Sequence, residues 1–415
     1  MRRFFAIAVF LTIVACSAEQ DPAPTFHAND NPQLLSAWGM MTISNGVLHL
    51  SDGVTPYDLA TPLFTDYALK LRTVWMPEDT AAQYDPDGTF SFPVGAVITK
   101  TFYYPQETAD WTQSVVANGH ATITNNALGL AGYRLIETRI LVRREAGWDA
   151  LPYVWNEDQT DAMLKRTGDL KPLTLVRDDG RREDFSYVVP NANQCAGCHA
   201  TNATTKAIQP IGMKARHLNK KSTYHPAFNQ LDYWLAAGML TISESDATLQ
   251  SSLHPEEPRP ALRNAAQRAA PQDEEAGRHE GEVKTERRST TAFPKNANWT
   301  DTAASLDARA RAYLDINCSH CHNPNGAADT SGLDLEPGAT GPSVGRCKLP
   351  IAAGGGSGGR LYDIVPGAPD QSITIFRMES TNPGAMMPEL GRSTTHEEGV
   401  ALITEWIAAM EGLCG

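Results

Sequence analysis

The chain has 415 residues, of which 41% are hydrophobic and 20% are charged. This length predicts two or three domains with sizeable cores, and the composition excludes a chain that is disordered throughout. The 35 basic and 48 acidic side chains give a formal net charge of −13 without any basic block, so we expect no nucleic-acid partner. No apolar run reaches the roughly 18 residues that a transmembrane helix needs.

Residues 1–15 have the pattern of an export signal peptide. Two arginines follow Met1, an apolar stretch extends from Phe4 to Val14, and a small residue precedes Cys16. The four residues that end at Cys16 resemble the box of bacterial lipoproteins, which implies cleavage before this cysteine and its lipidation. Several acyl chains would anchor the mature protein stably. The serine that follows implies an outer-membrane lipoprotein on the periplasmic side of a Gram-negative cell envelope, and the polar residues 16–33 predict a tether.

Residues 34–190 predict an antiparallel, β-rich, sandwich-like domain. The run from Phe90 to Tyr104 is rich in β-branched and aromatic side chains and follows a turn signal of aspartate, proline and glycine. The run from Tyr133 to Arg143 alternates apolar and charged side chains, as a half-buried strand does. Several short strands at such spacing are typical of an antiparallel sandwich.

Four of the seven cysteines fall into two copies of one pattern. The copies are Cys195-Ala-Gly-Cys198-His199 and Cys318-Ser-His-Cys321-His322. C-x-x-C-H is the attachment sequence of c-type haem. Two thiols about one helical turn apart reach the two vinyl groups on one edge of the porphyrin, and the next histidine lies under the iron. We therefore expect two covalently bound haem c groups, with His199 and His322 as their proximal ligands.

Two alternatives use the same cysteines. One is a single zinc site with all four thiolates as ligands, which leaves both histidines unexplained and joins ligand pairs that are far apart in sequence. The other is a pair of disulfides with a structural or oxidoreductase role, for which a thioredoxin-like βαβ context is missing.

The rest of the chain predicts an α+β multidomain protein. The first motif lies in a small segment, residues 191–253, directly after the β-rich region. Residues 254–298 mix glutamate with arginine and have no aromatic side chain before Phe293, which predicts a charged linker. Residues 299–415 predict an all-α, cytochrome c-like domain, because one apolar helical stripe leads into Cys318 and a second one lies near the end of the chain.

The sixth ligand of the second haem is expected in the loop before the last helix. Met387 stands there directly before Pro388, with Met386 beside it. This loop resembles that of class I cytochromes c, whose distal methionine commonly precedes a proline. The resemblance implies Met387 as the ligand, with Met386 as the second choice. A histidine–methionine pair raises the reduction potential relative to two histidines.

The sixth ligand of the first haem stays open at this point. The nearby candidates are His217, Met213, Met239 and His225, and an open iron is a further alternative. Among them we favour His217. His320, inside the second motif, points away from its own iron by geometry, and we expect it on the surface.

Cys347 and Cys414 remain after the other five cysteines are assigned. In an oxidising compartment such a pair most simply forms a disulfide. The loop that it closes would have about 68 residues and could contribute on the order of 4 kcal/mol in the chain-entropy model.

The chain resembles a poorly characterised family of bacterial exported dihaem c-type cytochromes, in a lipoprotein form. The motifs that carry the resemblance are Tyr57–Tyr67, Tyr153–Ala162, Cys195–His199, Gly212–Asn219, Ala310–His322 and Met387–Gly391. It implies covalent haem, export and electron transfer, and it implies no substrate. Some relatives are encoded beside a parallel β-helix protein, which implies a partner of that kind.

Three functions are compatible with these features. The first and favoured one is a redox carrier that passes electrons between periplasmic or membrane redox proteins, with an acidic surface that steers basic partners. The second is a peroxidase- or oxidase-like dihaem oxidoreductase with an open coordination site on the first haem. The third is a binding module whose β-rich domain docks a partner or a polysaccharide.

Overall fold

The computed structural model describes residues 23–107, 113–117, 119, 123–243, 293–351 and 353–415. The expected signal peptide and Cys16 lie outside these residues, as do parts of the expected tether and most of the expected charged linker. Across the described residues, no helix combines the length and the apolar character needed to cross a bilayer.

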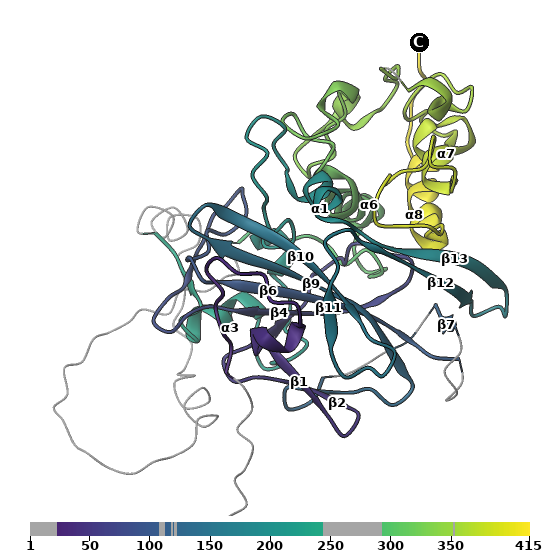
Figure 1. The fold of residues 1–415 in the computed structure, drawn as a ribbon. Helices are drawn as coiled ribbons and strands as arrows, with labels where there is room; N and C mark the ends of the chain where they lie inside the picture. The colour runs from purple at the N-terminus through teal and green to yellow at the C-terminus, as the bar shows by residue number, and fades with distance from the viewer. Residues whose placement is uncertain (1–22, 108–112, 118, 120–122, 244–292, 352) are drawn as a thin grey trace, which may run out of the picture.

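A six-stranded antiparallel sheet forms the centre of the molecule (Figure 1). Its strands, in spatial order, are β11 (Ala162–Leu164), β10 (Gly147–Trp155), β9 (Tyr133–Arg144), β6 (Val97–Pro105), β4 (Leu69–Trp75) and β3 (Thr55–Tyr57). The sequence runs from 90 to 104 and from 133 to 143, both expected to be strands, contribute β6 and β9 to its middle. Their alternation places one set of side chains on each face of the sheet.

Three smaller sheets surround the central one. Their strands are β1 (Met41–Ser44), β2 (Val47–Leu50) and β8 (Ala127–Gly129); β7 (Ser114–Val116), β12 (Asp169–Val176) and β13 (Arg182–Val189); and β5 (Ala82–Gln83) with β14 (Leu240–Thr241). In the second of these sheets β7 pairs in parallel with β12. In the third sheet β14 pairs in parallel with β5.

The two faces of the central sheet are covered differently. On one face, Leu71, Ile140 and Tyr153 pack in a cluster with Leu48 of β2 and Trp38 of the 3-10 turn η1 (Leu35–Trp38). This cluster is a continuous apolar core.

The opposite face carries two separate apolar clusters. One contains Val74 and Ile98 and is covered by the segment with α2 (Ala215–Leu218) and α3 (Gln230–Ala236). The other contains Phe102 and Val154, together with residues of β12 and β13. Polar and charged side chains of β4, β6 and β9 lie between the two clusters, and both C-x-x-C-H motifs lie on this side of the sheet.

The remaining helices gather beyond that face (Figure 1). They are α1 (Ala192–His199), α6 (Leu306–Leu314), α7 (Ile373–Glu379) and α8 (Glu397–Ala408). The π-helical turn η3 (Asp315–Ser319) continues α6, and Tyr313 and Leu314 pack against Ile403 and Ile407 of α8. The two apolar stripes read from the sequence therefore face each other.

The expected fold class is wrong in its C-terminal part. The structure is β-rich, with 27% of the described residues in strands and 21% in helices, and residues 299–415 do not form an all-α cytochrome c-like domain. Between α6 and α8 the described residues hold only α7, irregular loops and short turns. These turns are η4 (Asp329–Ser331), η5 (Gly341–Val344), η6 (Gly354–Ser357) and η7 (Pro369–Gln371). Frequent glycine and proline in this stretch explain why the helices do not extend.

The C-terminal part is also joined to the β-rich part by buried polar contacts. The Phe64 backbone N–H donates to Asn317 Oδ1 at 2.8 Å. Asp66 Oδ1 accepts from the N–H groups of Ser393 and Thr394 at 2.7 and 2.8 Å and from Thr394 Oγ1 at 2.9 Å. Ile316 packs in the same cluster as Val74 of the central sheet. These contacts fix the second motif against the sheet.

Candidate haem-attachment site

The first motif lies on α1, a short helix that begins directly after β13. Asn191 caps it in a reciprocal capping box, in which Asn191 Oδ1 accepts from the Gln194 N–H at 2.9 Å and Gln194 Oε1 accepts from the Asn191 N–H at 3.0 Å. The cap makes an eight-residue helix feasible at this point, and it places Cys195 and Cys198 about one turn apart, with His199 at the last position.

The second motif follows a longer helix. Ser305 caps α6 by accepting from the Ala308 N–H, and the helix widens into η3, which contains Cys318. The His322 N–H donates to the Cys318 carbonyl at 2.9 Å, so the motif ends in a further turn. Single π-helical turns often occur at functional sites.

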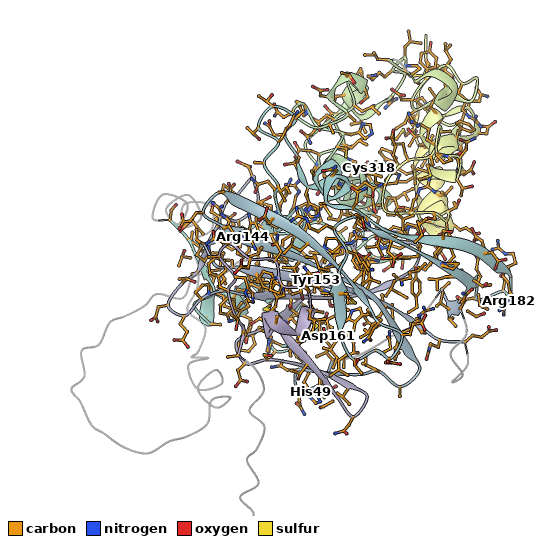
Figure 2. The ribbon with its side chains drawn as sticks, viewed as in Figure 1. His49, Arg144, Tyr153, Asp161, Arg182 and Cys318 are labelled. Atoms are coloured by element: carbon orange, nitrogen blue, oxygen red, sulfur yellow. A yellow bond between two sulfur atoms is a disulfide. The ribbon has the colours of Figure 1, made fainter. Side chains whose placement is uncertain are left out.

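The two motifs meet in space although they are far apart in sequence. Cys321 Sγ lies 3.6 Å from the Gly197 carbonyl oxygen, across 124 positions of the chain. The Ala203 N–H donates to the Asn325 carbonyl at 2.6 Å. α1 and α6 accordingly lie together above the central sheet in Figure 1, and Figure 2 shows Cys318 in the same region.

Both motif histidines are oriented by a hydrogen bond at Nδ1. His199 Nδ1 lies 2.7 Å from the Gln209 carbonyl oxygen, and His322 Nδ1 lies 3.1 Å from Ser331 Oγ. Burial lowers the pKa of each imidazole to about 4, so both rings are neutral near pH 7. A neutral imidazole with its Nδ1–H donated to an acceptor presents Nε2 as a metal ligand, which is the arrangement that axial histidines need.

The four motif cysteines are free thiols in the structure. Burial raises the pKa of Cys318 and of Cys321 to about 12 and also raises the pKa of Cys195 and Cys198. The described residues contain no group of three or more histidine, cysteine, aspartate or glutamate side chains that could hold a metal ion. Neither the four-thiolate zinc site nor the two disulfides considered from the sequence is formed, whereas free thiols one turn apart fit thioether attachment.

The loop with Met387 lies beside the motifs. A Cβ atom at Gly197 would lie 3.0 Å from Leu390 Cδ1, so this loop touches α1. The Met387 N–H donates to the Arg377 carbonyl at 2.9 Å, and the Met387 carbonyl accepts from Arg392 Nε at 3.1 Å. Met387 is partly buried.

The candidate sixth ligands for the first haem each contact other side chains in the structure. His217 is 2% exposed, with Nε2 3.7 Å from Asp315 Oδ2 and Nδ1 3.4 Å from Asn296 Nδ2. Met213 and Met239 pack in the apolar cluster under α3. His225 stacks on Tyr233, with 3.7 Å between the ring centroids.

His320 is not the surface residue that the sequence led us to expect. Its side chain is 8% exposed, and its Nδ1 has no hydrogen-bond partner among the described residues. Burial, followed by the proximity of His199 and His322, lowers the pKa of this imidazole to about 3. His199 of the other motif, which is distant in sequence, lies close enough to act on this ring, and the spacing within one motif does not show such a neighbour.

A second feature that the sequence did not reveal is a row of cations on the sheet. β4 pairs with β6 so that Arg72 lies opposite Lys100, and β6 pairs with β9 so that Lys100 lies opposite Arg139. We call Arg72, Lys100 and Arg139 the cation row. Its members come from three separate sequence segments, and only the strand register shows that they are neighbours.

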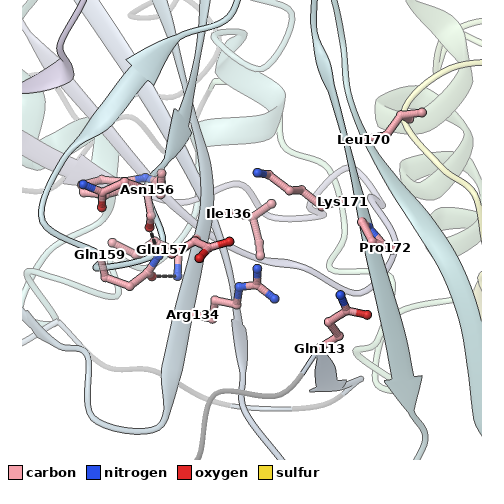
Figure 3. A pocket seen from close by; sticks show the side chains of 11 residues that line it. Gln113, Arg134, Ile136, Asn156, Glu157, Gln159, Leu170, Lys171 and Pro172 are labelled. Atoms are coloured by element: carbon pink, nitrogen blue, oxygen red, sulfur yellow. Dashed lines mark hydrogen bonds between the residues drawn. The ribbon is translucent and has the colours of Figure 1, made fainter.

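A polar pocket of about 240 Å³ is lined by residues outside the motifs (Figure 3). Arg134 and Ile136 of β9, Glu157 and Gln159 after β10, and Lys171 of β12 are among its lining residues. It contains no motif cysteine or histidine and none of the candidate axial ligands.

Cys347 and Cys414 form a disulfide, with their Cα atoms 5.2 Å apart. It closes the C-terminal segment between η5 and the residues after α8.

Comparisons of the chain with protein-family models, with curated proteins and with solved structures gave no match. The case for a function therefore depends on the residues and their geometry.

Proposed function

We propose that this chain is an exported, lipid-anchored dihaem c-type cytochrome that transfers electrons between redox partners on the periplasmic side of the cell envelope. One haem c would be held by Cys195, Cys198 and His199, and the other by Cys318, Cys321 and His322. Haem c, when bound, supplies one-electron chemistry by alternating between Fe(II) and Fe(III).

The contact between the two motifs is the observation that carries this proposal. With Cys321 Sγ 3.6 Å from the Gly197 carbonyl, two groups attached at these motifs would be neighbours, as direct electron transfer between them requires. The Nδ1 hydrogen bonds of His199 and His322 add a second, independent argument, because they leave Nε2 of each ring for an axial bond.

The sixth ligands are part of the proposal. Met387 is our candidate at the second motif, since Glu389 of its loop is among the charges that act on Cys321. At the first motif, His217 remains a candidate from the sequence, and the buried ring of His320, whose Nδ1 has no hydrogen-bond partner among the described residues, joins it. The net charge of −13 favours basic redox partners, and a parallel β-helix protein is one proposed partner.

Haem counting tests the proposal. The mature protein should contain two haem c groups per chain in a pyridine haemochrome assay, and a redox titration should resolve two one-electron steps. A protein without covalent haem would contradict the proposal.

A peroxidase- or oxidase-like dihaem oxidoreductase is the second candidate. It is favoured by one observation: Met213, Met239 and His225 all pack against other side chains. An iron without a sixth protein ligand would bind carbon monoxide in the reduced state. Saturable carbon monoxide binding by one haem per chain would favour this candidate over a carrier.

A further inference from the structure

The cation row is electrostatically unfavourable unless an anion lies beside it. Arg72, Lys100 and Arg139 lie directly opposite one another on three adjacent strands, and like charges in directly opposed positions destabilise a sheet. Lys70 lies in the next row of the same face, opposite Phe102. Four cationic side chains thus share the middle of one face.

The carboxylates nearby compensate only part of this charge. Glu137 binds Arg139 with two hydrogen bonds of 2.9 and 2.5 Å and also accepts from the Tyr187 hydroxyl. Asp58 lies 3.9 Å from Arg72, at the limit of an ion pair, and Arg72 Nη2 has no hydrogen-bond partner although the residue is only 4% exposed. A buried guanidinium with an unpaired nitrogen requires a partner.

The two lysines also have too few anionic partners. Among the described residues Lys100 forms no hydrogen bond or ion pair, and its Nζ lies 4.9 Å from the centroid of the Phe102 ring. Lys70 Nζ lies 5.8 Å from the same centroid and donates to the Ala68 carbonyl, and Asp66 is the carboxylate that acts on this ammonium group. Burial, followed by the neighbouring guanidinium of Arg72, lowers the pKa of both ammonium groups. An anion at this point would compensate the positive charge of these side chains.

This face lies next to the first motif. α1 packs on β10, and β10 is the neighbour of β9, which carries Arg139. Lys100 and Arg139 are also among the charges that act on His199 and Cys198. The cations therefore lie where a group attached to Cys195 and Cys198 would need counter-charges.

We propose that the cation row and Lys70 form a binding site for the carboxylates of an anionic ligand. Guanidinium and ammonium groups together suit a carboxylate, because arginine forms paired hydrogen bonds and lysine adds a point charge. Two sources share this chemistry: the two propionate groups of the first haem, or a free small dicarboxylate. In the first case the inference rests on the proposed function.

The experiment compares the full-length wild-type protein with Lys100→Met and Lys70→Met, which keep side-chain length and remove the charge. Lys100→Arg is the charge-preserving variant, and Lys165→Met, an exposed lysine between β11 and β12, is the matched control. Each protein is examined by haem counting, by resonance Raman spectroscopy of the propionate bending modes, and by calorimetric titration with succinate.

If the carboxylates are the haem's own, the propionate modes shift in Lys100→Met and Lys70→Met and stay unchanged in Lys100→Arg and Lys165→Met, and succinate does not bind. If the ligand is free, succinate binds the wild type saturably and at least tenfold more weakly to the two methionine variants at the row. Either result supports the site. Two haems per chain with unchanged propionate modes and no succinate binding overturn it and leave the proposed function intact.

A protein without haem contradicts the proposed function instead. The succinate titration then still decides the inference, because saturable binding that Lys100→Met weakens supports the site and no binding overturns it.

Discussion

The two C-x-x-C-H motifs have the same chemistry in different surroundings. Each ends in a neutral histidine whose Nδ1 is held by an acceptor. The first motif lies on the helix α1, next to the cation row, whereas the second begins in the π-helical turn η3 after α6, and Glu389 of the loop with Met387 acts on its Cys321. The five residues of each motif would attach a haem, whereas the surrounding fold would set the electrostatic environment of that haem. Two haems held at these motifs should therefore differ in reduction potential.

The largest expected effect comes from removing one pair of thiols at a time. Cys195→Ser with Cys198→Ser should reduce the haem content from two to one per chain, and Cys318→Ser with Cys321→Ser should do the same. Because the surroundings differ, the two variants should retain haems with different potentials. Pyridine haemochrome assays and redox titrations measure both properties.

The cysteines of the disulfide provide the control for this comparison. Cys347→Ser with Cys414→Ser should keep two haems per chain while losing on the order of 4 kcal/mol of stability. Equal haem loss in this control and in the motif variants would show that folding, not attachment, had been disturbed.

Replacement of Met387 should affect only the second motif. Met387→Ala should abolish the weak far-red absorption band that sulfur ligation gives to Fe(III), and it should lower the potential of one haem. Met386→Ala and Met213→Leu serve as controls that keep the band. If the band survives in Met387→Ala, Met387 is not the ligand.

Asp66 should matter for stability because it holds the loop before α8 on the sheet. Asp66→Ala leaves three hydrogen-bond donors of Ser393 and Thr394 without their acceptor and should cost about 2–4 kcal/mol of unfolding free energy. Asp66→Asn retains Oδ1 as an acceptor and should cost clearly less. Denaturant titrations that find both variants equally stable would contradict this role.

A smaller effect is expected from pH at His396. This ring stacks on Phe64 at 4.1 Å between centroids, and burial, followed by Lys70 and Arg177, lowers its pKa to about 3. Below about pH 6.5 the unfolded chain binds a proton there that the folded chain does not. The free energy of unfolding should therefore fall toward pH 3, with His396 contributing up to about 1.4 kcal/mol per pH unit.

His396→Phe should show a shallower fall over the same pH range, whatever its absolute stability. Denaturant titrations at several pH values compare the two slopes. Equal slopes in the wild type and the variant would contradict the assignment of this proton to His396.

Local sequence patterns predicted local features well. The strand runs around Phe102 and Ile140, the apolar stripes of α6 and α8, and the spacing of each motif all depend on neighbours within a few residues. The all-α C-terminal domain was wrong because helical stripes do not show how the chain between them folds. Apart from α7, frequent glycine and proline limit that stretch to loops and short turns.

The contacts between distant segments were not predictable. Arg72, Lys100 and Arg139 each look like an ordinary polar strand residue, and only the register of three strands makes them a row. His320 looked exposed because His199, one of its neighbours in space, belongs to another part of the chain. Sequence periodicity contains no information on such packing.

The mass of the denatured mature protein tests the central claim most directly. After extraction with acidic acetone, which removes haem that is not covalently bound, the polypeptide should remain coloured and should weigh as much as the processed chain plus two haem groups. A colourless polypeptide with the mass of the chain alone would contradict the account.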